Sequence, residues 1–191
     1  RIAETSKLTY LSSGMSDWEE LDRAVEILRK SCQLIPMQCT SSYPCESDDV
    51  GLNVIQEMIK RYDLPVGFSD HTLGFAAGIG AVILGCKVVE KHITFSKLMY
   101  GSDAAHSMEP NEFKMFCSSL KEAALIRNSK VDKNDNDKFE SMKRIFEKSI
   151  VTSKYLKKGE ILCKDNISYK KPGDGISASL YKEVIGKKLR K

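Results

Sequence analysis

The chain has 191 residues, of which 41% are hydrophobic and 29% are charged. This balance is typical of a folded globular domain and argues against a disordered or low-complexity segment. Lys and Arg number 30 against 26 for Asp and Glu, a net charge of +4, and this excess is too small to indicate a nucleic-acid or membrane surface as the partner. Small molecules or further copies of the chain are the expected partners.

Strand-length apolar runs alternate with segments of helical period four times along the first part of the chain. The predicted strands are residues 8–11, 35–39, 65–69 and 88–94. The predicted helices are residues 16–28, 54–59, 75–84 and 112–126. This order predicts parallel strands joined by right-handed crossovers, and therefore an α/β fold.

The ends of the predicted strands distinguish two kinds of parallel sheet. No G-x-G-x-x-G follows the first strand, which disfavours a dinucleotide-binding doubly wound sheet. All four strands end in polar, reactive residue types, as expected where loops build a site at the carboxyl-end face of a (β/α)8 barrel. Four units are half of such a barrel, so the chain is a fragment or its other half is supplied elsewhere.

A polar run at residues 128–138 separates the predicted barrel part, residues 1–127, from a second region. We place the linker at residues 128–147 and a small β-rich domain at residues 148–191. Short β-like pieces at 149–151, 161–162 and 167–169 alternate there with Gly- and Pro-containing turn signals.

Cellular location and membrane association follow from three further features. The longest uncharged stretch, residues 73–86, is shorter than the roughly 20 apolar residues of a membrane helix and is predicted as a buried helix. Six cysteines without a C-x-x-C motif are expected to be reduced thiols in the cytoplasm. The chain opens with Arg1 and has no leader pattern, so we expect the middle of a longer protein.

His71 and His92 fall at or near the carboxyl ends of two consecutive predicted strands. Neighbouring strands lie about 4.8 Å apart, so inward side chains at matching heights can share one divalent ion. Each histidine could equally be a hydrogen-bonded residue at the barrel rim, because two imidazoles without a third ligand do not define a metal site.

The two-residue period of a strand places Ser69 and His71 on one face of the third strand, and Glu90 and His92 on one face of the fourth. A carboxylate facing inward is costly unless it is paired. Glu90 therefore orients other groups, acts as a general acid or base, or forms a structural ion pair; the residues alone favour the ion pair.

Hydroxyl side chains gather at the same predicted face and suit the oxygens of a phosphate, carboxylate or sugar. They are Ser12, Ser13, Thr40, Ser41, Ser42, Tyr43 and Ser69. Any one of them could instead cap a helix or stabilise a turn, so the hypothesis depends on the whole group. Cys39 and Cys45 are interpreted as packing residues.

Six motifs occur in order over nearly the whole chain. They are Ser12-Ser13-Gly14-Met15, Cys39-Thr40-Ser41-Ser42-Tyr43-Pro44, Gly67-Phe68-Ser69-Asp70-His71-Thr72, Glu90-Lys91-His92-Ile93-Thr94, Gly101-Ser102-Asp103 with Ser107-Met108-Glu109-Pro110, and Lys171-Pro172-Gly173-Asp174-Gly175-Ile176. Together they resemble the sialic acid synthase family, which includes the N-acetylneuraminate, legionaminate and pseudaminate synthases.

The resemblance implies a TIM barrel with a C-terminal antifreeze-like (SAF) domain, in a domain-swapped homodimer. This chain would be the C-terminal half barrel and part of the SAF domain. The implied enzyme is a transferase that condenses phosphoenolpyruvate with an N-acetylated sugar such as N-acetylmannosamine, giving a nine-carbon 2-keto acid and phosphate. Because the family's first four strands and the last strands of its SAF domain are missing, we expect the isolated chain to be inactive.

The resemblance also assigns site residues. His71 and His92 match the family's two ligands for Mn²⁺ or Mg²⁺, which would polarise the sugar aldehyde. Glu90, considered above from its place on the fourth strand, is the third candidate catalytic residue. The candidate substrate contacts are Ser12, Ser41, Tyr43 and Ser69 for phosphoenolpyruvate, Asp103 for sugar hydroxyls, and Lys171 for the partner subunit's sugar.

Three positions depart from the family pattern. Ser41 stands where some members carry Asn. Lys171 stands where many carry Arg; it keeps the positive charge but cannot donate the two parallel hydrogen bonds of a guanidinium. Ala104 stands where many relatives have His, so it receives no role.

Two other functions stay open beside the synthase. One is a non-catalytic sugar-binding or regulatory remnant of such an enzyme, which would bind the sugar without catalysing a reaction. A metal-dependent aldolase-type barrel using pyruvate is disfavoured, because a Schiff-base enzyme would need an isolated inward lysine and Lys91 is out of phase with His92.

Overall fold

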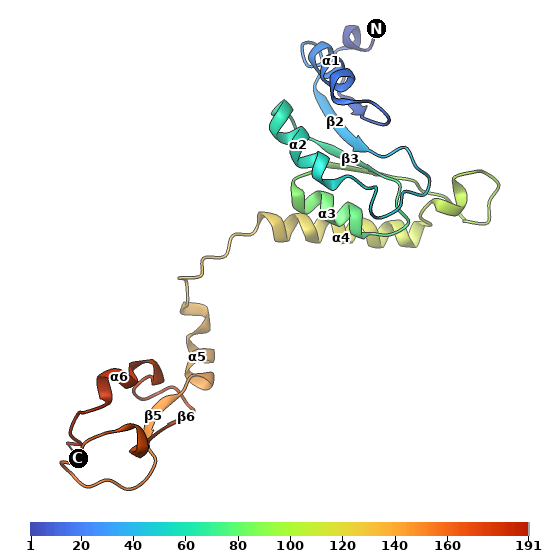
Figure 1. The fold of residues 1–191 in the computed structure, drawn as a ribbon. Coiled ribbons are helices and arrows are strands. Elements are labelled where there is room, and N and C mark those ends of the chain that lie inside the picture. The colour runs from blue at the N-terminus through green and yellow to red at the C-terminus, as the bar shows by residue number, and fades with distance from the viewer. Residues whose placement is uncertain (191) are drawn as a thin grey trace. The chain divides into compact units, whose positions relative to one another are not determined.

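The computed structural model describes residues 1–190. The chain divides into two compact units, Arg1–Lys130 and Val131–Lys191, and each is described by itself (Figure 1). The division lies inside the segment predicted as a linker.

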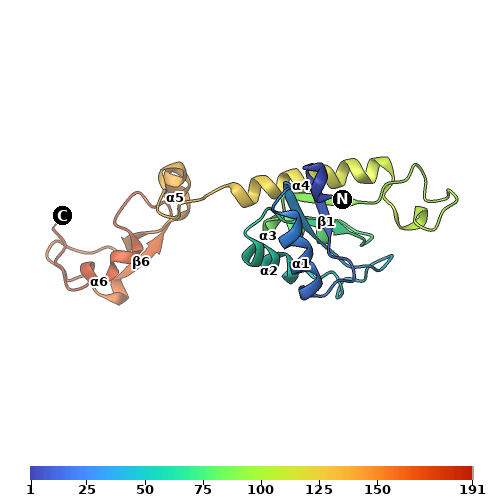
Figure 2. The ribbon, with the colours of Figure 1, turned by 90° about the horizontal axis from the view of Figure 1, so that it is seen from above.

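The first unit is a four-stranded parallel sheet with helices between its strands (Figures 1 and 2). The strands pair in chain order, β1-β2-β3-β4, and each is followed by a helix. They are β1 (Thr9–Ser12), α1 (Trp18–Leu28), β2 (Leu34–Cys39), α2 (Leu52–Tyr62), β3 (Gly67–Asp70), α3 (Ala76–Leu84), β4 (Val88–Lys91) and α4 (Pro110–Asn128). The predicted α/β class with a parallel sheet is confirmed.

The fourth strand is shorter than predicted. β4 ends at Lys91, and His92 and Thr94 then exchange backbone hydrogen bonds with Met108. Residues 92–94, which the apolar pattern placed in the fourth strand, therefore pair with Met108 in the segment before α4 and not with β3. As a result His92 lies just beyond the strand end instead of within it.

The core lies between the sheet and helices α1 to α3. Alternate strand residues such as Leu34 and Phe68 face the helices and pack against Val25, Ile55 and Ala81. Burial of each large side chain in this layer contributes about 1.5–3 kcal/mol. Because strand side chains alternate, the residues between them point to the opposite face of the sheet.

That opposite face is only partly covered. Met37 and Ser69 are buried on it, but Tyr10 of the edge strand β1 is 50% exposed and Glu90 of β4 is also exposed. The sheet therefore has one packed face and one face open at both edges. No helix in residues 1–190 has the length and apolar character that crossing a bilayer requires.

α4 begins with a capping box. The Glu109 backbone N–H donates to the Glu112 carboxylate at 2.9 Å, and Pro110 occupies the first helical turn. α4 packs against α3 through Phe116 and Gly78. Because a methyl group at Gly78 would overlap the Phe116 ring, the two helices approach closely only while that position is glycine.

The second unit contains one antiparallel pair of strands, β5 (Ser149–Thr152) and β6 (Ile167–Lys170), and the short helix α6 (Tyr181–Val184). The predicted β-like piece at 161–162 forms only an isolated bridge between Ile161 and Lys188. The predicted linker is not wholly irregular, because it contains the helix α5 (Glu140–Phe146). None of the α5 residues is buried.

Candidate functional site

The site is built where the parallel strands β2, β3 and β4 end at the same edge of the sheet. Register pairs Cys39 with Ser69 and Ser69 with Glu90, so the side chains of these three residues lie on one face. The Ser69 hydroxyl donates to Glu90 Oε1 at 2.7 Å. Within residues 1–190 Glu90 forms no ion pair, so the predicted ion pair is wrong and a neutral hydroxyl holds this carboxylate.

His71 follows β3 and is buried, with 7% of its surface exposed. Its Nδ1 lies 2.8 Å from the Thr40 carbonyl oxygen. A carbonyl oxygen only accepts, so Nδ1 carries the proton and a neutral His71 keeps its lone pair on Nε2. Ser69 Oγ lies 3.3 Å from Nε2, but its single proton is directed to the closer Glu90 oxygen. Nε2 is therefore available to bind an electrophile.

Three rings from different loops form a cluster at this edge. The ring centroids of His71 and His92 are 5.4 Å apart in an edge-on arrangement. Tyr43 stacks on His71 at 4.1 Å and lies 5.3 Å from His92. Partial burial raises the pKa of the Tyr43 phenol above its ordinary value, and the acidic groups of Cys39, Asp103 and Glu90 add to the shift.

Asp103 approaches the cluster from the long loop after β4. Its Oδ2 lies 3.8 Å from His92 Nδ1, and its side chain is 57% exposed. This distance is too long for a hydrogen bond, and the contact is an ion pair only when His92 is protonated. A cavity of about 380 Å³ borders His92 and Asp103, and Thr94, Ser102 and Ser107 are among the other residues that line it.

The remaining predicted site residues lie outside this ring cluster. Ser12 ends β1, two strands away from β3, which corresponds to roughly 10 Å, and it is exposed. Ser41 is exposed and lines a separate cavity of about 480 Å³ with Ser13 and Trp18. Lys171 belongs to the second unit, where its ammonium lies 4.9 Å from the Phe146 ring centroid.

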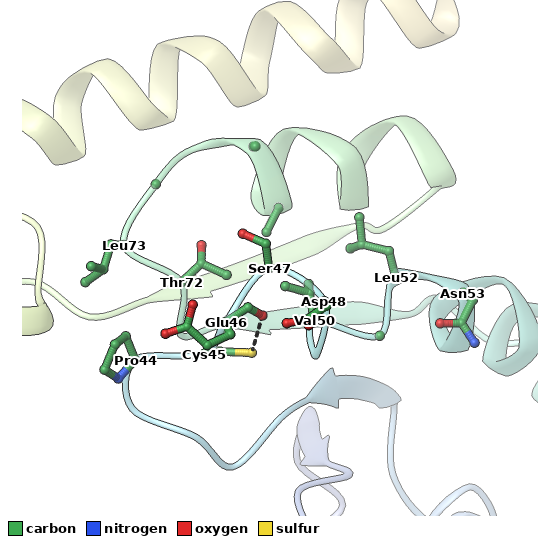
Figure 3. Close-up of a pocket in the computed structure, with 14 residues that line it drawn as sticks. Pro44, Cys45, Glu46, Ser47, Asp48, Val50, Leu52, Asn53, Thr72 and Leu73 are labelled. Atoms are coloured by element: carbon green, nitrogen blue, oxygen red, sulfur yellow. Dashed lines mark hydrogen bonds between the residues drawn. The ribbon is translucent and has the colours of Figure 1, made fainter.

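A further cavity, of about 540 Å³, lies between the loops that follow β2 and β3 and is open to solvent. Figure 3 shows the two loops facing each other across it, with Cys45 and Val50 on one side and Thr72 and Leu73 on the other. None of the residues of the ring cluster lines this cavity. Burial raises the pKa of the Cys45 thiol, in keeping with a packing role.

Sequence reasoning missed an ion pair directly behind the site. Asp70 and Lys91 pair in register on the helix-facing side of the sheet, with Lys91 Nζ 3.0 Å from Asp70 Oδ2. The available signal was that each charge immediately precedes one of the two histidines. Recognising the pair also required the register of β3 against β4.

The side chains at this edge of the sheet supply only part of the ligand set of a metal ion. Within residues 1–190 no group of three or more His, Cys, Asp or Glu side chains is arranged to hold one. The two imidazoles fit as a partial donor set, because a histidine that donates Nδ1–H to a carbonyl is oriented like many metal-binding histidines. Water or a substrate would have to supply the other ligands.

Residues 1–132 match the family model described as NeuB family, and residues 147–191 match the model described as SAF domain. The chain belongs to the NeuB family. The resemblance inferred from the six motifs is thereby confirmed.

Several relatives of this NeuB-family chain are named synthases. It is 36% identical to an N,N'-diacetyllegionaminic acid synthase of Campylobacter jejuni, over 98% of this chain and 57% of that protein. It is 35% identical to a pseudaminic acid synthase of the same species, over 100% of this chain and 55% of that protein. The chain spans about half the length of the curated relatives it matches.

A solved relative supports the fold. An N-acetylneuraminic acid (sialic acid) synthetase from Leptospira borgpetersenii superimposes with a TM-score of 0.67 at 29% identity, covering 73% of this chain and 50% of that one.

Proposed function

We propose that this chain carries part of the active site of a sialic-acid-type synthase, which condenses phosphoenolpyruvate with an N-acetylated sugar such as N-acetylmannosamine. The products are a nine-carbon 2-keto sugar acid and phosphate. The observation that carries the proposal is the placement of His71 and His92 beside the Ser69–Glu90 pair, with ring centroids 5.4 Å apart. The names of two relatives, a legionaminic and a pseudaminic acid synthase, support it.

The fold proposed for the whole enzyme is a TIM barrel, of which the four βα units are half. Two features of the first unit support this. β1 and β4 are edges of the sheet, and Tyr10 and Glu90 are exposed on the face opposite the helices. Closing the sheet with further strands would remove both edges and cover that face. A domain-swapped homodimer that brings Lys171 to a partner's site is part of the same proposal.

His71 and His92 are the proposed protein ligands of a Mn²⁺ or Mg²⁺ ion. When bound, the ion would supply Lewis-acid polarisation of the sugar aldehyde oxygen. The Thr40 carbonyl contributes by holding Nδ1–H of His71, which leaves Nε2 directed into the site. Tyr43, stacked on the same ring at 4.1 Å, limits the access of water to it.

Glu90 is the proposed general acid or base. Its carboxylate accepts the Ser69 hydroxyl proton at 2.7 Å, which orients one oxygen and leaves the other free to take or return a proton at the substrate. The exposed carboxylate of Asp103 can accept hydrogen bonds from sugar hydroxyls at the cavity beside His92. The hydroxyls of Ser12, Ser41 and Ser69 can donate to phosphate or carboxylate oxygens.

The test uses a protein that carries this segment within the full length of its relatives. With phosphoenolpyruvate, N-acetylmannosamine and Mn²⁺ we expect release of phosphate. His71→Ala should lower that rate by about 10²-fold or more, because the loss of Lewis-acid stabilisation is worth several kcal/mol. His106→Ala is the matched control, since His106 lies in the short helix Ala104–His106 outside the ring cluster. If His71→Ala releases phosphate as fast as His106→Ala, the assignment is wrong.

A sugar-binding remnant without catalysis is the second candidate. It is favoured by the observation that residues 1–190 hold no three-ligand metal group. Calorimetric titration of the chain with N-acetylmannosamine separates the two. Binding that is unchanged by a chelator and by His71→Ala would favour the remnant, and binding that requires Mn²⁺ would favour the synthase.

A further inference from the structure

A buried ion pair lies directly behind the proposed metal ligands, and the proposed chemistry does not use it. Lys91 Nζ is 3.0 Å from Asp70 Oδ2, and the two side chains are 2% and 0% exposed. Among residues 1–190, Lys91 is the one cation that pairs with the Asp70 carboxylate. Such a pair often stabilises a fold no more than apolar residues of similar size would, so stability alone does not account for its presence.

The hydrogen bonds of the pair converge on Thr72, the residue that follows His71. Asp70 Oδ1 accepts from the Thr72 backbone N–H at 2.9 Å and from its hydroxyl at 2.8 Å. Lys91 Nζ donates to the Thr72 carbonyl and to Gly74 O. The bond from Asp70 to the N–H two residues on closes an Asx turn with His71 at its centre. The residues before and after His71, Asp70 and Thr72, are therefore both fixed by hydrogen bonds, and this restrains the backbone of His71.

The pair also joins the two strands at their last register position. Asp70 pairs with Lys91 across β3 and β4, and the next residues along the chain are His71 and His92. Because side chains alternate, the two charges point to the helices while the two imidazoles point to the site. The ion pair thus sets how far the strand ends are offset from each other, and with it the spacing of the two rings.

Phe116 of α4 covers the pair from the helix side. Lys91 Nζ lies 5.7 Å from the centroid of this ring, which is 1% exposed. Water is kept away from the ammonium, so its contacts with Asp70 and Thr72 are stronger than exposed ones would be.

We infer that Asp70, Lys91 and Thr72 form a positioning triad that holds His71 and His92 at the spacing a shared divalent cation requires. The cation rests on the proposed function, whereas the placement of the rings does not. The three residues act through the histidines and touch no substrate.

The test compares the 191-residue chain with Asp70→Asn/Lys91→Met and with Thr72→Val. The paired substitution removes both charges together, so it leaves no unpaired buried charge that would prevent folding. Thr72→Val removes only the hydroxyl, and Thr9→Val on β1 is its matched control. Two quantities are measured: the Kd for Mn²⁺, from the paramagnetic resonance signal of free Mn²⁺, and the tautomer of His71, from its ring nitrogen NMR shifts.

We expect the parent chain and Thr9→Val to bind Mn²⁺ equally and to hold His71 as the Nδ1–H tautomer. The paired variant should bind Mn²⁺ about 10- to 100-fold more weakly, the range found when groups that orient metal ligands are removed, and should show mixed tautomers. Thr72→Val should show a smaller loss in the same direction.

Two outcomes overturn the inference, and a third bears on the proposed function. If the paired variant keeps both the Kd and the tautomer of the parent, the triad is only structural. The same holds if the paired variant fails to fold and Thr72→Val matches the parent in both quantities. If the parent itself binds no Mn²⁺, the metal part of the proposed function fails, and the tautomer alone decides whether the triad positions His71.

Discussion

The contact between α3 and α4 gives a prediction whose magnitude follows from the structure. A methyl group at Gly78 would lie 2.5 Å and 2.6 Å from Phe116 Cζ and Cε2, about 1 Å closer than carbon atoms pack. The Phe116 ring cannot easily move, because it is 1% exposed and packs against Phe75 at 5.5 Å. Overpacking of this kind costs about 1–3 kcal/mol, while replacing a helical glycine by alanine gains about 1 kcal/mol. The difference predicts that Gly78→Ala destabilises the first unit by up to about 2 kcal/mol.

Gly80 in the same helix provides the matched control. A methyl group there meets only Leu52 Cδ1, at 2.9 Å, and the far end of that flexible side chain can rotate away. Gly80→Ala should therefore leave stability unchanged or raise it by up to about 1 kcal/mol. Urea unfolding followed by fluorescence of Trp18, the single tryptophan, reports on the first unit. The reasoning is refuted if Gly78→Ala is as stable as Gly80→Ala.

Two further predictions follow from shifted pKa values. The hydrogen-bonded Arg61 guanidinium holds the pKa of Asp22 below its ordinary value, so this contact stabilises the fold above pH about 4 and is lost as the pH falls through the lower folded-state value. In Asp22→Asn the free energy of unfolding should decrease less steeply as the pH falls below about 4. A decrease as steep as that of the parent chain would contradict the assignment. Burial raises the pKa of the Cys86 thiol to about 12, so at pH 8 iodoacetamide should modify the exposed Cys163 at least about tenfold faster. Timed mass spectrometry checks this, and equal rates would show that Cys86 reaches solvent in the folded chain.

The strands and helices of the first unit could be predicted because their patterns are local. Leu21, Val25 and Leu28 recur at helical spacing and are all buried in α1, and the apolar run at residues 35–39 lies in β2. The approach of His71 to His92 could also be anticipated, because residues that follow adjacent parallel strands must lie near each other.

The partners of charged residues could not be predicted in the same way. The residues alone favoured an ion pair for Glu90, yet its partner is the Ser69 hydroxyl and the ion pair belongs to Asp70 and Lys91. The choice depends on strand register and on which face α4 covers, and neither is encoded near these residues. The end of β4 was misplaced for a related reason, because Met108, a distant residue, pairs with the chain beyond Lys91.

Periodicity and motif order were enough to predict the parallel α/β class, the family and the proximity of His71 to His92, because each of these depends on residues a few positions apart or on their order in the chain. The tertiary structure alone decided three features. They are the tautomer of His71, the hydrogen bond from the Ser69 hydroxyl to Glu90, and the hydrogen bonds of Asp70 and Lys91 to Thr72. These features depend on hydrogen bonds between different strands and loops, and such bonds exist only once the strands are in register and α4 has excluded water from the helix-facing side of the sheet.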